Sequence, residues 1–415
     1  MSLIIAAPSS GSGKTTITLG ILRALAQRGT PIRAAKSGPD YIDPQFHAAA
    51  CGNPCINLDA WAMPADTIKQ LAQDPLIIEG AMGLFDGAPP AGKGSTADLA
   101  RILELPVILV VDASAMAQSI APLVKGFATH DPHVQIAGVI LNRVGSERHA
   151  RMLRTALAPT NIPVIGCVMR NAALARPSRH LGLVQPSEMP DLEGFLNAAA
   201  EIMTQSIDLD ALLAHGRPLP AHASQIAKAD HPKTIAIARD AAFAFRYAQD
   251  DAQLIAQGHT LKYFSPLAND PVPVADHIIL PGGYPELHAQ TIANAHRFMG
   301  TLREAARLKP ISGECGGYMV LGETLTDADG TAHDMAGLLG LATSFETRKL
   351  HLGYRTLKRA GQPDLKGHEF HYATTLMAAG TPLYDAYDAE NTPLGPMGLI
   401  EGNVSGSFAH IIGTD

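Results

Sequence analysis

Apolar runs alternate with helix-forming segments over the first half of the chain. Between the first two runs, Ile17, Ile21 and Leu25 recur every four residues, as on the buried face of an amphipathic helix. Strands that are apolar throughout and separated by helices predict a parallel sheet with both faces covered, and hence the α/β fold class. The six predicted strands lie at residues 2–7, 31–36, 75–80, 106–112, 135–142 and 162–168.

The pattern weakens at residues 205–232, which are rich in Pro, His and Ala and carry no sustained strand signal. A second alternation then begins, and its end consists of mixed strand-like runs. Its predicted strands lie at residues 233–240, 259–266, 276–286 and 309–319. We therefore expect a first domain over residues 1–204, a linker over 205–232 and a second α/β domain over 233–415.

Composition and charge narrow the class of protein. The chain has 415 residues, more than a single hydrophobic core usually holds. Its content of 46% hydrophobic and 17% charged residues is typical of a soluble globular protein. A net charge of −7 argues against general nucleic-acid or membrane-surface binding. No apolar run approaches the about 18 residues that span a bilayer, and the N-terminus lacks the basic region of a signal peptide. Four scattered cysteines do not suggest a disulfide framework, so we expect a reduced, cytoplasmic protein.

Residues 7–16 read APSSGSGKTT and lie between a predicted strand and a predicted helix. Small residues in such a loop let backbone N–H groups point at phosphate oxygens, and the helix N-terminus adds positive charge. We expect Lys14 on the β- and γ-phosphates and the Thr15 hydroxyl on Mg²⁺. Pro8 replaces the first glycine of the usual pattern, but the strand and helix around the loop support ATP binding. The other candidate ATP-binding residues are Ser10, Gly11, Ser12, Gly13 and Thr16.

Polar residues follow several predicted strands, at the sheet edge where α/β proteins bind ligands. A lysine there stabilises charge on a transferring phosphoryl group, and carboxylates hold Mg²⁺ or order a substrate. The alternative is a solvated acidic edge. The candidates for contact with the phosphoryl group or substrate are Lys36, Asp40, Tyr41, Asp43 and Asp86, and the candidate metal ligands are Thr15, Asp40 and Glu79.

Asn142 ends a predicted strand late in the first domain. Its amide offers one donor and one acceptor, which suits the edge of adenine, so we expect it to bind ATP. Asparagine in this place also caps helices, which is the alternative.

The stretch GECGG places Cys315 between a predicted strand and a predicted helix, as in a nucleophile elbow, where we expect the helix N-terminus to lower the pKa of the thiol. A buried structural cysteine is the alternative. His410 is the candidate base for the thiol. The candidate oxyanion donors are the backbone N–H groups of Gly282, Gly283 and Gly316.

These motifs carry a family resemblance. The first half resembles the dethiobiotin-synthetase-like P-loop ATPases, which phosphorylate a carboxylate. The second half resembles the class I glutamine amidotransferases, which release ammonia from glutamine through a cysteine thioester. Over nearly its whole length the chain resembles the cobyrinate (hydrogenobyrinate) a,c-diamide synthase family, on the motifs APSSGSGKTT, KSGPDYIDP, EGAMGLFDG, GGYPE, GECGG, LGYR and GHEFHY.

The resemblance implies an ATP-dependent amidation in cobalamin biosynthesis. ATP would convert the a and c carboxylates of a corrinoid substrate to acyl phosphates, which ammonia from L-glutamine then attacks. ATP and L-glutamine are co-substrates in this interpretation, and Mg²⁺ is the cofactor. We expect no nucleic-acid or membrane partner, and a homodimer stays open as the assembly.

Several questions stay open at this point. Class I enzymes usually carry a Glu two residues after the histidine, where this chain has Ile412. The cobyrinate-type branch that the chain resembles also uses Cys and His without that Glu. The residue that orients His410 is therefore undetermined. Cobalt-containing and cobalt-free rings are both candidate substrates. Nickel sirohydrochlorin and another tetrapyrrole are alternatives, and cobyric acid synthase is related. A different class is a non-catalytic P-loop switch fused to an inert amidotransferase-like domain.

GHEFHY and LGYR need separate interpretation. Strand alternation places His368 and His371 on opposite faces, which argues against a metal site built from that pair. Tyr354 and Arg355 are candidates for binding an anionic substrate, or for a solvated strand face.

Overall fold

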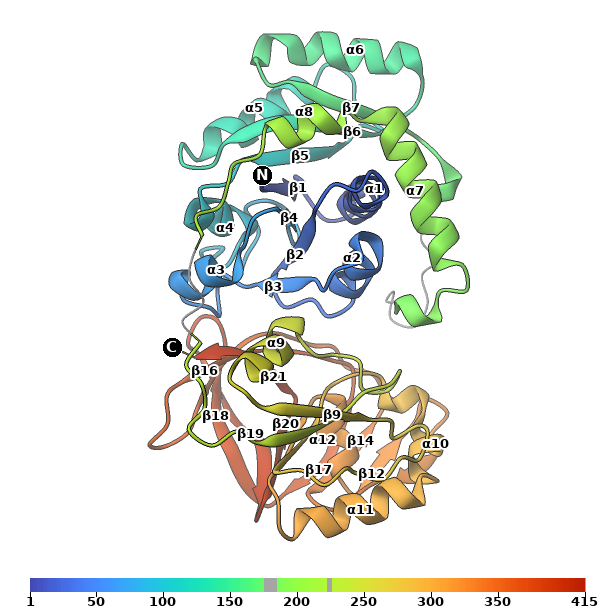
Figure 1. Ribbon diagram of the computed structural model, residues 1–415, viewed down its shortest axis with the longest axis vertical. Helices are drawn as coiled ribbons and strands as arrows, with labels where there is room; N and C mark the ends of the chain where they lie inside the picture. The colour runs from blue at the N-terminus through green and yellow to red at the C-terminus, as the bar shows by residue number, and fades with distance from the viewer. Residues whose placement is uncertain (175–184, 222–225, 415) are drawn as a thin grey trace. The chain divides into compact units, whose positions relative to one another are not determined.

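The chain forms two compact units, Met1–Ser224 and Gln225–Asp415, in a computed structural model that describes residues 1–174, 185–221 and 226–414 (Figure 1). Within those residues, no helix has both the length and the apolar character needed to cross a membrane.

Part of the segment expected to be a linker is folded into the first unit. Helix α8 (Leu209–Ala214) forms there, with Asp208 accepting a hydrogen bond from the Ala211 N–H at 2.9 Å as its N-cap. Leu209 and Leu212 are buried, so a short apolar face holds this helix on the unit. The expected linker over 205–232 therefore begins too early in the chain, because α8 lies within it and belongs to the first unit.

The first unit is built on a seven-stranded sheet in the order β3-β2-β4-β1-β5-β6-β7. Every neighbouring pair is parallel, which confirms the predicted class. All six predicted strands form, and β3 is an addition that the sequence reading missed because it has only three residues. The strands are β1 (Leu3–Ala6), β2 (Arg33–Ser37), β3 (Ile56–Leu58), β4 (Leu76–Glu79), β5 (Val107–Asp112), β6 (Ile136–Val144) and β7 (Val164–Met169).

Helices cover both faces of this sheet (Figure 1). On one face lie α1 (Lys14–Gln27), α2 (Asp43–Cys51) and α7 (Leu192–Ser206); on the other lie α3 (Ala65–Leu71), α4 (Thr96–Leu103) and α5 (Ile120–His130), and α6 (Glu147–Leu157) packs against α5. Because β1, β2 and β4 are neighbours, the loops that follow them meet at one edge of the sheet.

The second unit contains a ten-stranded mixed sheet in the order β21-β16-β15-β18-β19-β20-β11-β10-β8-β9. Its parallel part holds the four predicted strands, β8 (Thr234–Ala238), β9 (Thr260–Phe264), β10 (His277–Leu280) and β11 (Ile311–Glu314), and the late strand β20 (Val404–Ser407). The antiparallel part holds β15 (His351–Lys358), β16 (Leu365–His371), β18 (Thr381–Tyr387), β19 (Pro393–Glu401) and β21 (Ala409–Thr414).

A smaller sheet and several helices complete the second unit. The sheet has the order β13-β12-β14-β17 and consists of β12 (Thr324–Thr326), β13 (Ala332–Asp334), β14 (Gly340–Ser344) and β17 (Thr374–Ala379). The helices are α9 (Ala248–Ala256), α10 (Ala289–Ala293), α11 (His296–Ala306) and α12 (Gly316–Leu321). A Cβ on Gly317 would lie 1.9 Å from the carbonyl oxygen of Leu280, so only glycine lets α12 approach β10 this closely.

Gly20 on α1 provides a test of the packing in the first unit. A Cβ at this position would lie 2.8 Å from the backbone oxygen of Ala199 on α7 and 2.5 Å from Met203 Cγ. We expect Gly20→Ala to lower the free energy of unfolding of this unit by about 1–3 kcal/mol, because the two helices must move apart. Urea titration followed by the fluorescence of Trp61, the single tryptophan, reports on this unit.

Gly126 on α5 is the matched control, since no atom lies within 4 Å of its Cβ position. Gly126→Ala should stabilise the unit by about 0.5–1 kcal/mol through helix propensity. Equal effects of the two substitutions would contradict the close packing of α1 on α7.

Candidate functional sites

The loop after β1 has the backbone expected of a phosphate-binding loop. Gly11 and Gly13 have φ angles of 81° and 84°, which favour glycine, and Gly13 is the N-cap of α1. The Ser12 hydroxyl donates to the carbonyl oxygen of Ser9 at 2.9 Å. Ser10 is exposed and Thr16 is half-buried. The N-terminus of α1 therefore opens directly onto the loop, as anion binding requires.

Asn142 lies against this loop. Its Nδ2 donates to the carbonyl oxygen of Ser12 at 2.9 Å, and its Oδ1 accepts from the Arg143 N–H at 2.9 Å. A Cβ on Gly13 would lie 2.2 Å from Nδ2, so the amide packs directly on the loop backbone. The structure thus gives the Asn142 amide a part in fixing the loop, and the adenine contact that the sequence suggested stays a prediction.

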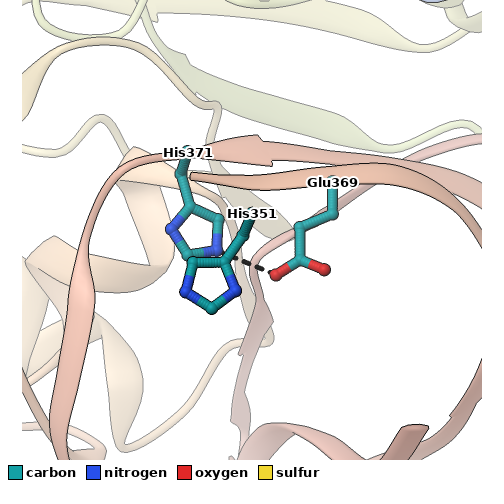
Figure 2. A group of neighbouring side chains, drawn as sticks. All are labelled: His351, Glu369 and His371. Carbon is teal, nitrogen blue, oxygen red and sulfur yellow. Dashed lines mark hydrogen bonds and ion pairs between the residues drawn. The ribbon is translucent and has the colours of Figure 1, made fainter. Parts of the chain in front are cut away.

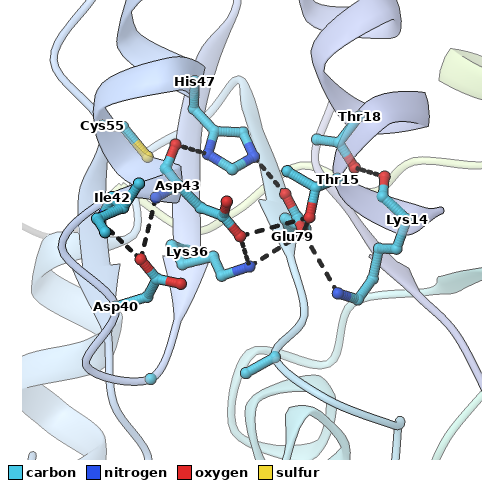
Figure 3. Close-up of polar contacts among 12 residues, drawn as sticks. Lys14, Thr15, Thr18, Lys36, Asp40, Ile42, Asp43, His47, Cys55 and Glu79 are labelled. Carbon is cyan, nitrogen blue, oxygen red and sulfur yellow. Dashed lines mark hydrogen bonds and ion pairs between the residues drawn. The ribbon is translucent and has the colours of Figure 1, made fainter. Parts of the chain in front are cut away.

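Glu79 is fully buried at the centre of a charged cluster at the sheet edge (Figure 3). Its Oε1 accepts from Thr15 Oγ1 at 2.6 Å, from Lys36 Nζ at 3.0 Å and from Lys14 Nζ at 3.2 Å. Its Oε2 bonds with Nε2 of His47. The structure therefore brings together the lysine and threonine of the loop with the residues at the ends of β2 and β4.

The two aspartates of the segment after β2 have different surroundings (Figure 3). Asp43 Oδ2 lies 2.8 Å from Lys36 Nζ and accepts from the Thr15 hydroxyl at 3.4 Å. Asp40 Oδ1 instead accepts from the N–H groups of Ile42 and Asp43, at 2.7 and 3.0 Å, and so forms a local turn. Asp43 therefore contacts Thr15 directly and shares Lys36 as a partner with Glu79.

Burial and charge act in opposite directions in this cluster. Burial lowers the pKa of Lys14, reinforced by Lys36 and opposed by Glu79. Burial disfavours the ionised form of Glu79, but Lys36, Lys14 and His47 outweigh it and hold its pKa well below the usual range. Burial likewise opposes the charge of Lys36, yet Asp43 and Glu79 raise its pKa. At neutral pH the centre of the cluster is therefore an ionised Glu79.

His47 was not among the sequence candidates. It is buried on α2, four residues after Asp43, and its Nδ1 bonds with the backbone oxygen of Asp43. Residues four apart lie on the same face of a helix, so the spacing of Asp43 and His47 in the sequence could have indicated that both belong to the site.

Asp86 is exposed in the glycine-rich loop after β4, and Tyr41 is half-buried in the segment after β2. Asp86 Oδ2 accepts from the Gly83 N–H at 2.8 Å, which closes the glycine-rich loop after β4. The Leu84 N–H donates to the Ala7 oxygen at 2.8 Å, so this loop lies beside the phosphate loop.

In the second unit, Cys315 forms a sharp turn between β11 and α12. Its φ and ψ are 47° and −106°, a strained conformation for a residue with a Cβ, and it is the N-cap of α12. The Cys315 N–H donates to the Ser407 oxygen at 2.8 Å. This geometry is that of a nucleophile elbow.

His410 and the predicted glycines surround this turn. The position of a Cβ on Gly282 lies 2.9 Å from His410 Nε2 and 3.2 Å from Cys315 Cβ, so the histidine and the cysteine meet at Gly282. The Gly283 nitrogen lies 3.1 Å from the Cβ position of Gly316. The three glycines thus gather beside Cys315.

The expectation that the helix N-terminus lowers the pKa of the thiol is wrong. Burial of Cys315, which is 2% exposed, raises its pKa, and the carboxylates of Glu286 and Glu369 add to the effect. The Gly316 N–H bonds to the sulfur and lowers the pKa, but this single dipole does not offset burial. Burial therefore favours the neutral form of this thiol.

His351, Glu369 and His371 form a cluster of potential metal ligands in the antiparallel sheet, with their ligand atoms within 4.8 Å of one another (Figure 2). The two imidazole rings are stacked, with centroids 4.7 Å apart and an angle of 8° between their planes. An ion bound by both rings must lie near both ring planes, which stacked parallel rings do not allow. The cluster is therefore better explained as a structural one.

The remaining contacts of Glu369 agree with that interpretation. Its Oε1 bonds with His371 at 2.8 Å, and Arg355 contacts its Oε2 through Nε and Nη2 at 2.8 and 2.7 Å. Burial opposes the ionisation of Glu369, but His371 and Arg355 lower its pKa to about 2. Arg355 is thus paired with a neighbouring strand and is not a solvated surface residue.

The chain is similar to known proteins in both units. Residues 3–184 match the CobQ/CobB/MinD/ParA nucleotide binding domain, and residues 234–414 match the CobB/CobQ-like glutamine amidotransferase domain. A protein of Brucella anthropi named hydrogenobyrinate a,c-diamide synthase is 53% identical over 99% of this chain and 98% of its own length. Proteins of the same name from Brucella abortus and Mesorhizobium japonicum are 51% and 49% identical, with the same coverage.

The two interpretations of Asn142 differ in what they predict for nucleotide specificity. If the amide fixes the loop, Asn142→Ala should weaken the binding of ATP and GTP by the same factor. We expect about fivefold, since one hydrogen bond contributes about 1 kcal/mol. Titration calorimetry with the two magnesium nucleotides measures both affinities. A selective loss of ATP affinity would instead support adenine recognition by Asn142.

Proposed function

The chain belongs to the family of the hydrogenobyrinate a,c-diamide synthases, and we propose that its two units perform the two halves of one amidation reaction. It is an ATP-dependent ligase of cobalamin biosynthesis with glutamine as the amido donor. The observation that carries this conclusion is the full-length similarity, in which a nucleotide-binding domain precedes a glutamine amidotransferase domain.

The chemistry explains why both units are needed. Ammonia does not displace oxide from a carboxylate, so the acid must first receive a better leaving group. Transfer of the γ-phosphoryl group of ATP to the carboxylate gives an acyl phosphate and ADP. Attack by ammonia then forms the amide and releases phosphate. We assign the first transfer to the Glu79 cluster, because phosphoryl transfer depends mainly on positioning and on cations at the phosphate oxygens.

Lys14 and Lys36 are the cations of this step. The Nζ atoms of Lys14 and Lys36 lie 3.2 and 3.0 Å from the Oε1 atom of Glu79. Entry of a triphosphate gives the lysines a second set of anionic partners, which offsets the cost of burying their charge. Tyr41 and Asp86, in the segments after β2 and β4, are candidates for contact with the substrate.

Mg²⁺ fits the oxygen donors of the same cluster. The Thr15 hydroxyl hydrogen-bonds with the carboxylates of both Glu79 and Asp43, and all three groups offer the hard oxygen atoms that Mg²⁺ prefers. Asp43 takes the place that we first gave to Asp40, whose Oδ1 is used in the turn. When bound, the ion would neutralise charge on the phosphate oxygens.

Glutamine hydrolysis belongs to Cys315 and His410 in this proposal. His410 Nε2 takes the thiol proton as Sγ attacks the amide carbon, and the protonated ring then gives that proton to the leaving nitrogen. Ammonia departs and a thioester remains, which water hydrolyses to glutamate and the free thiol. Backbone N–H groups of Gly283 and Gly316 are the donors that we assign to the developing oxyanion.

Hydrogenobyrinate is the substrate that we propose, from the name shared by the full-length relatives. This choice favours the cobalt-free ring over cobyrinate, which the sequence motifs did not distinguish.

Mass spectrometry of the product tests the reaction. With MgATP, glutamine and hydrogenobyrinate, we expect two successive acid-to-amide mass changes and release of phosphate. Cys315→Ala should lose the reaction with glutamine but keep it with ammonia, because the first unit is intact. Cobyrinate is run in parallel to compare the rings. No product from either ring with any nitrogen source would refute the substrate, and intact glutamine as well would favour a non-catalytic protein.

Asp43→Asn and Asp40→Asn form a matched pair for the magnesium site. Asparagine keeps the oxygen that closes the Asp40 turn, whereas at position 43 it removes the charge next to Thr15. We expect the Mg²⁺ concentration for half-maximal ammonia-dependent activity to rise on the order of tenfold for Asp43→Asn. Asp40→Asn should leave it within about twofold. The reverse order would return the metal ligand to Asp40.

A further inference from the structure

The two ring nitrogens of His410 face different partners. Nε2 lies 2.9 Å from the Cβ position of Gly282, where the ring also meets Cys315. Nδ1 lies 3.6 Å from the Oε2 atom of Glu314. The imidazole of His410 therefore lies between Cys315 and the carboxylate of Glu314, the residue that directly precedes Cys315 in the chain.

We propose that Glu314 is the positioning residue of the cysteine site, holding the Nδ1–H of His410 so that Nε2 faces Cys315. The inference rests on the proposed glutaminase function of this unit. A carboxylate at Nδ1 selects the ring tautomer with a free Nε2 and stabilises the imidazolium that forms when Nε2 takes the thiol proton. The separation of 3.6 Å is longer than a hydrogen bond, and such contacts shorten when substrate binds.

The fold holds Glu314 at this place through its other oxygen. The Ile411 N–H donates to Oε1 at 3.4 Å, and Ile411 directly follows His410 on β21. One carboxylate thus contacts the backbone next to the histidine and, with its second oxygen, faces the ring. The side chain is 30% exposed, so it avoids most of the cost of burying an isolated charge.

The charged groups around Glu314 are consistent with a carboxylate in this role. Arg246 faces it and is paired with Asp251 of α9. Burial raises the pKa of Asp250 to about 7, and repulsion from Glu314 and Asp251 adds to it against the attraction of Arg246. Asp250 can thus take up a proton near neutral pH, which reduces repulsion of the Glu314 charge.

Two further groups face the histidine and Glu314 from the antiparallel strands. His368 pairs with His410 across β16 and β21, and burial, with His410 and Arg355, lowers its pKa to about 3. It is therefore a neutral neighbour. The pKa of Tyr384 on β18 is raised by burial and by Glu314, so this phenol is also neutral.

Glu369 is the other carboxylate to consider, and its position excludes it. It pairs with Ala409 in the register of β16 and β21, so its side chain lies on the opposite face of the sheet from His410. Its Oε1 bonds with His371 (Figure 2), and its Oε2 is paired with Arg355. Glu314 is therefore the carboxylate that faces Nδ1 of His410.

The substitution Glu314→Gln removes the charge of this side chain and keeps its hydrogen bond with the Ile411 N–H. Glutamine keeps an oxygen that accepts from the Ile411 N–H but does not stabilise an imidazolium as a carboxylate does. We expect kcat for glutamine hydrolysis to fall on the order of tenfold to a hundredfold, with KM for glutamine within about twofold. Ammonia-dependent amidation should be unchanged, and Glu314→Asp, which keeps the charge, should lose less.

A double-variant cycle shows whether Glu314 acts through the histidine. Labelling of Cys315 by 6-diazo-5-oxo-L-norleucine, followed by intact mass, gives a rate even where turnover is slow. In the His410→Ala background, Glu314→Gln should change this rate by less than about twofold.

The outcomes separate the inference from the function. A wild-type glutaminase rate in Glu314→Gln, equal losses in both backgrounds, or a parallel loss of ammonia-dependent amidation would each overturn the positioning role. Wild-type protein that neither hydrolyses glutamine nor reacts with the analogue would overturn the proposed function together with this inference.

Discussion

Burial of charge is the constraint on which the first site depends. Glu79 is fully buried, and an unpaired carboxylate there would cost several kcal/mol, so its partners must all be in place when the unit folds. Those partners come from different elements: Lys14 and Thr15 from α1, Lys36 from β2 and His47 from α2. The need to compensate one charge therefore holds the phosphate loop and two strand ends together, at the place where we propose that a triphosphate binds.

The second unit applies the same constraint to a thiol. Cys315 is buried beside carboxylates, which favour its neutral form, so the nucleophile does not ionise by itself at neutral pH. In the glutaminase reaction that we propose, the thiol ionises by transferring its proton to His410 as the sulfur attacks. A site of this kind protects the thiol from unselective reaction, at the cost of depending on an accurately placed base. The orientation of one imidazole thus becomes the property that the surrounding structure has to secure.

The sequence predicted much of this, because its signals are local. Long apolar strands, the glycine-rich loop and the cysteine between glycines each depend on a few adjacent residues. What it missed depends on contacts between distant residues: β3 has only three residues and pairs with β2, and α8 buries Leu209 and Leu212 in the first unit. The sequence also placed Asp40 and Asp43 together at the sheet edge, whereas the hydrogen bonds of the turn separate their surroundings.

Glu314 illustrates why such residues escape a reading of motifs. Its neighbour along the chain is Cys315, but its partner His410 lies 96 positions away, and only the sheet relates them. In the parallel pairing of β11 and β20, Glu314 lies opposite Ser407, and the Cys315 N–H donates to the same serine at 2.8 Å. Three residues later the chain presents His410 on β21. The separation of carboxylate, thiol and imidazole is therefore set by strand register, which is more rigid than a loop and better suited to positioning a base.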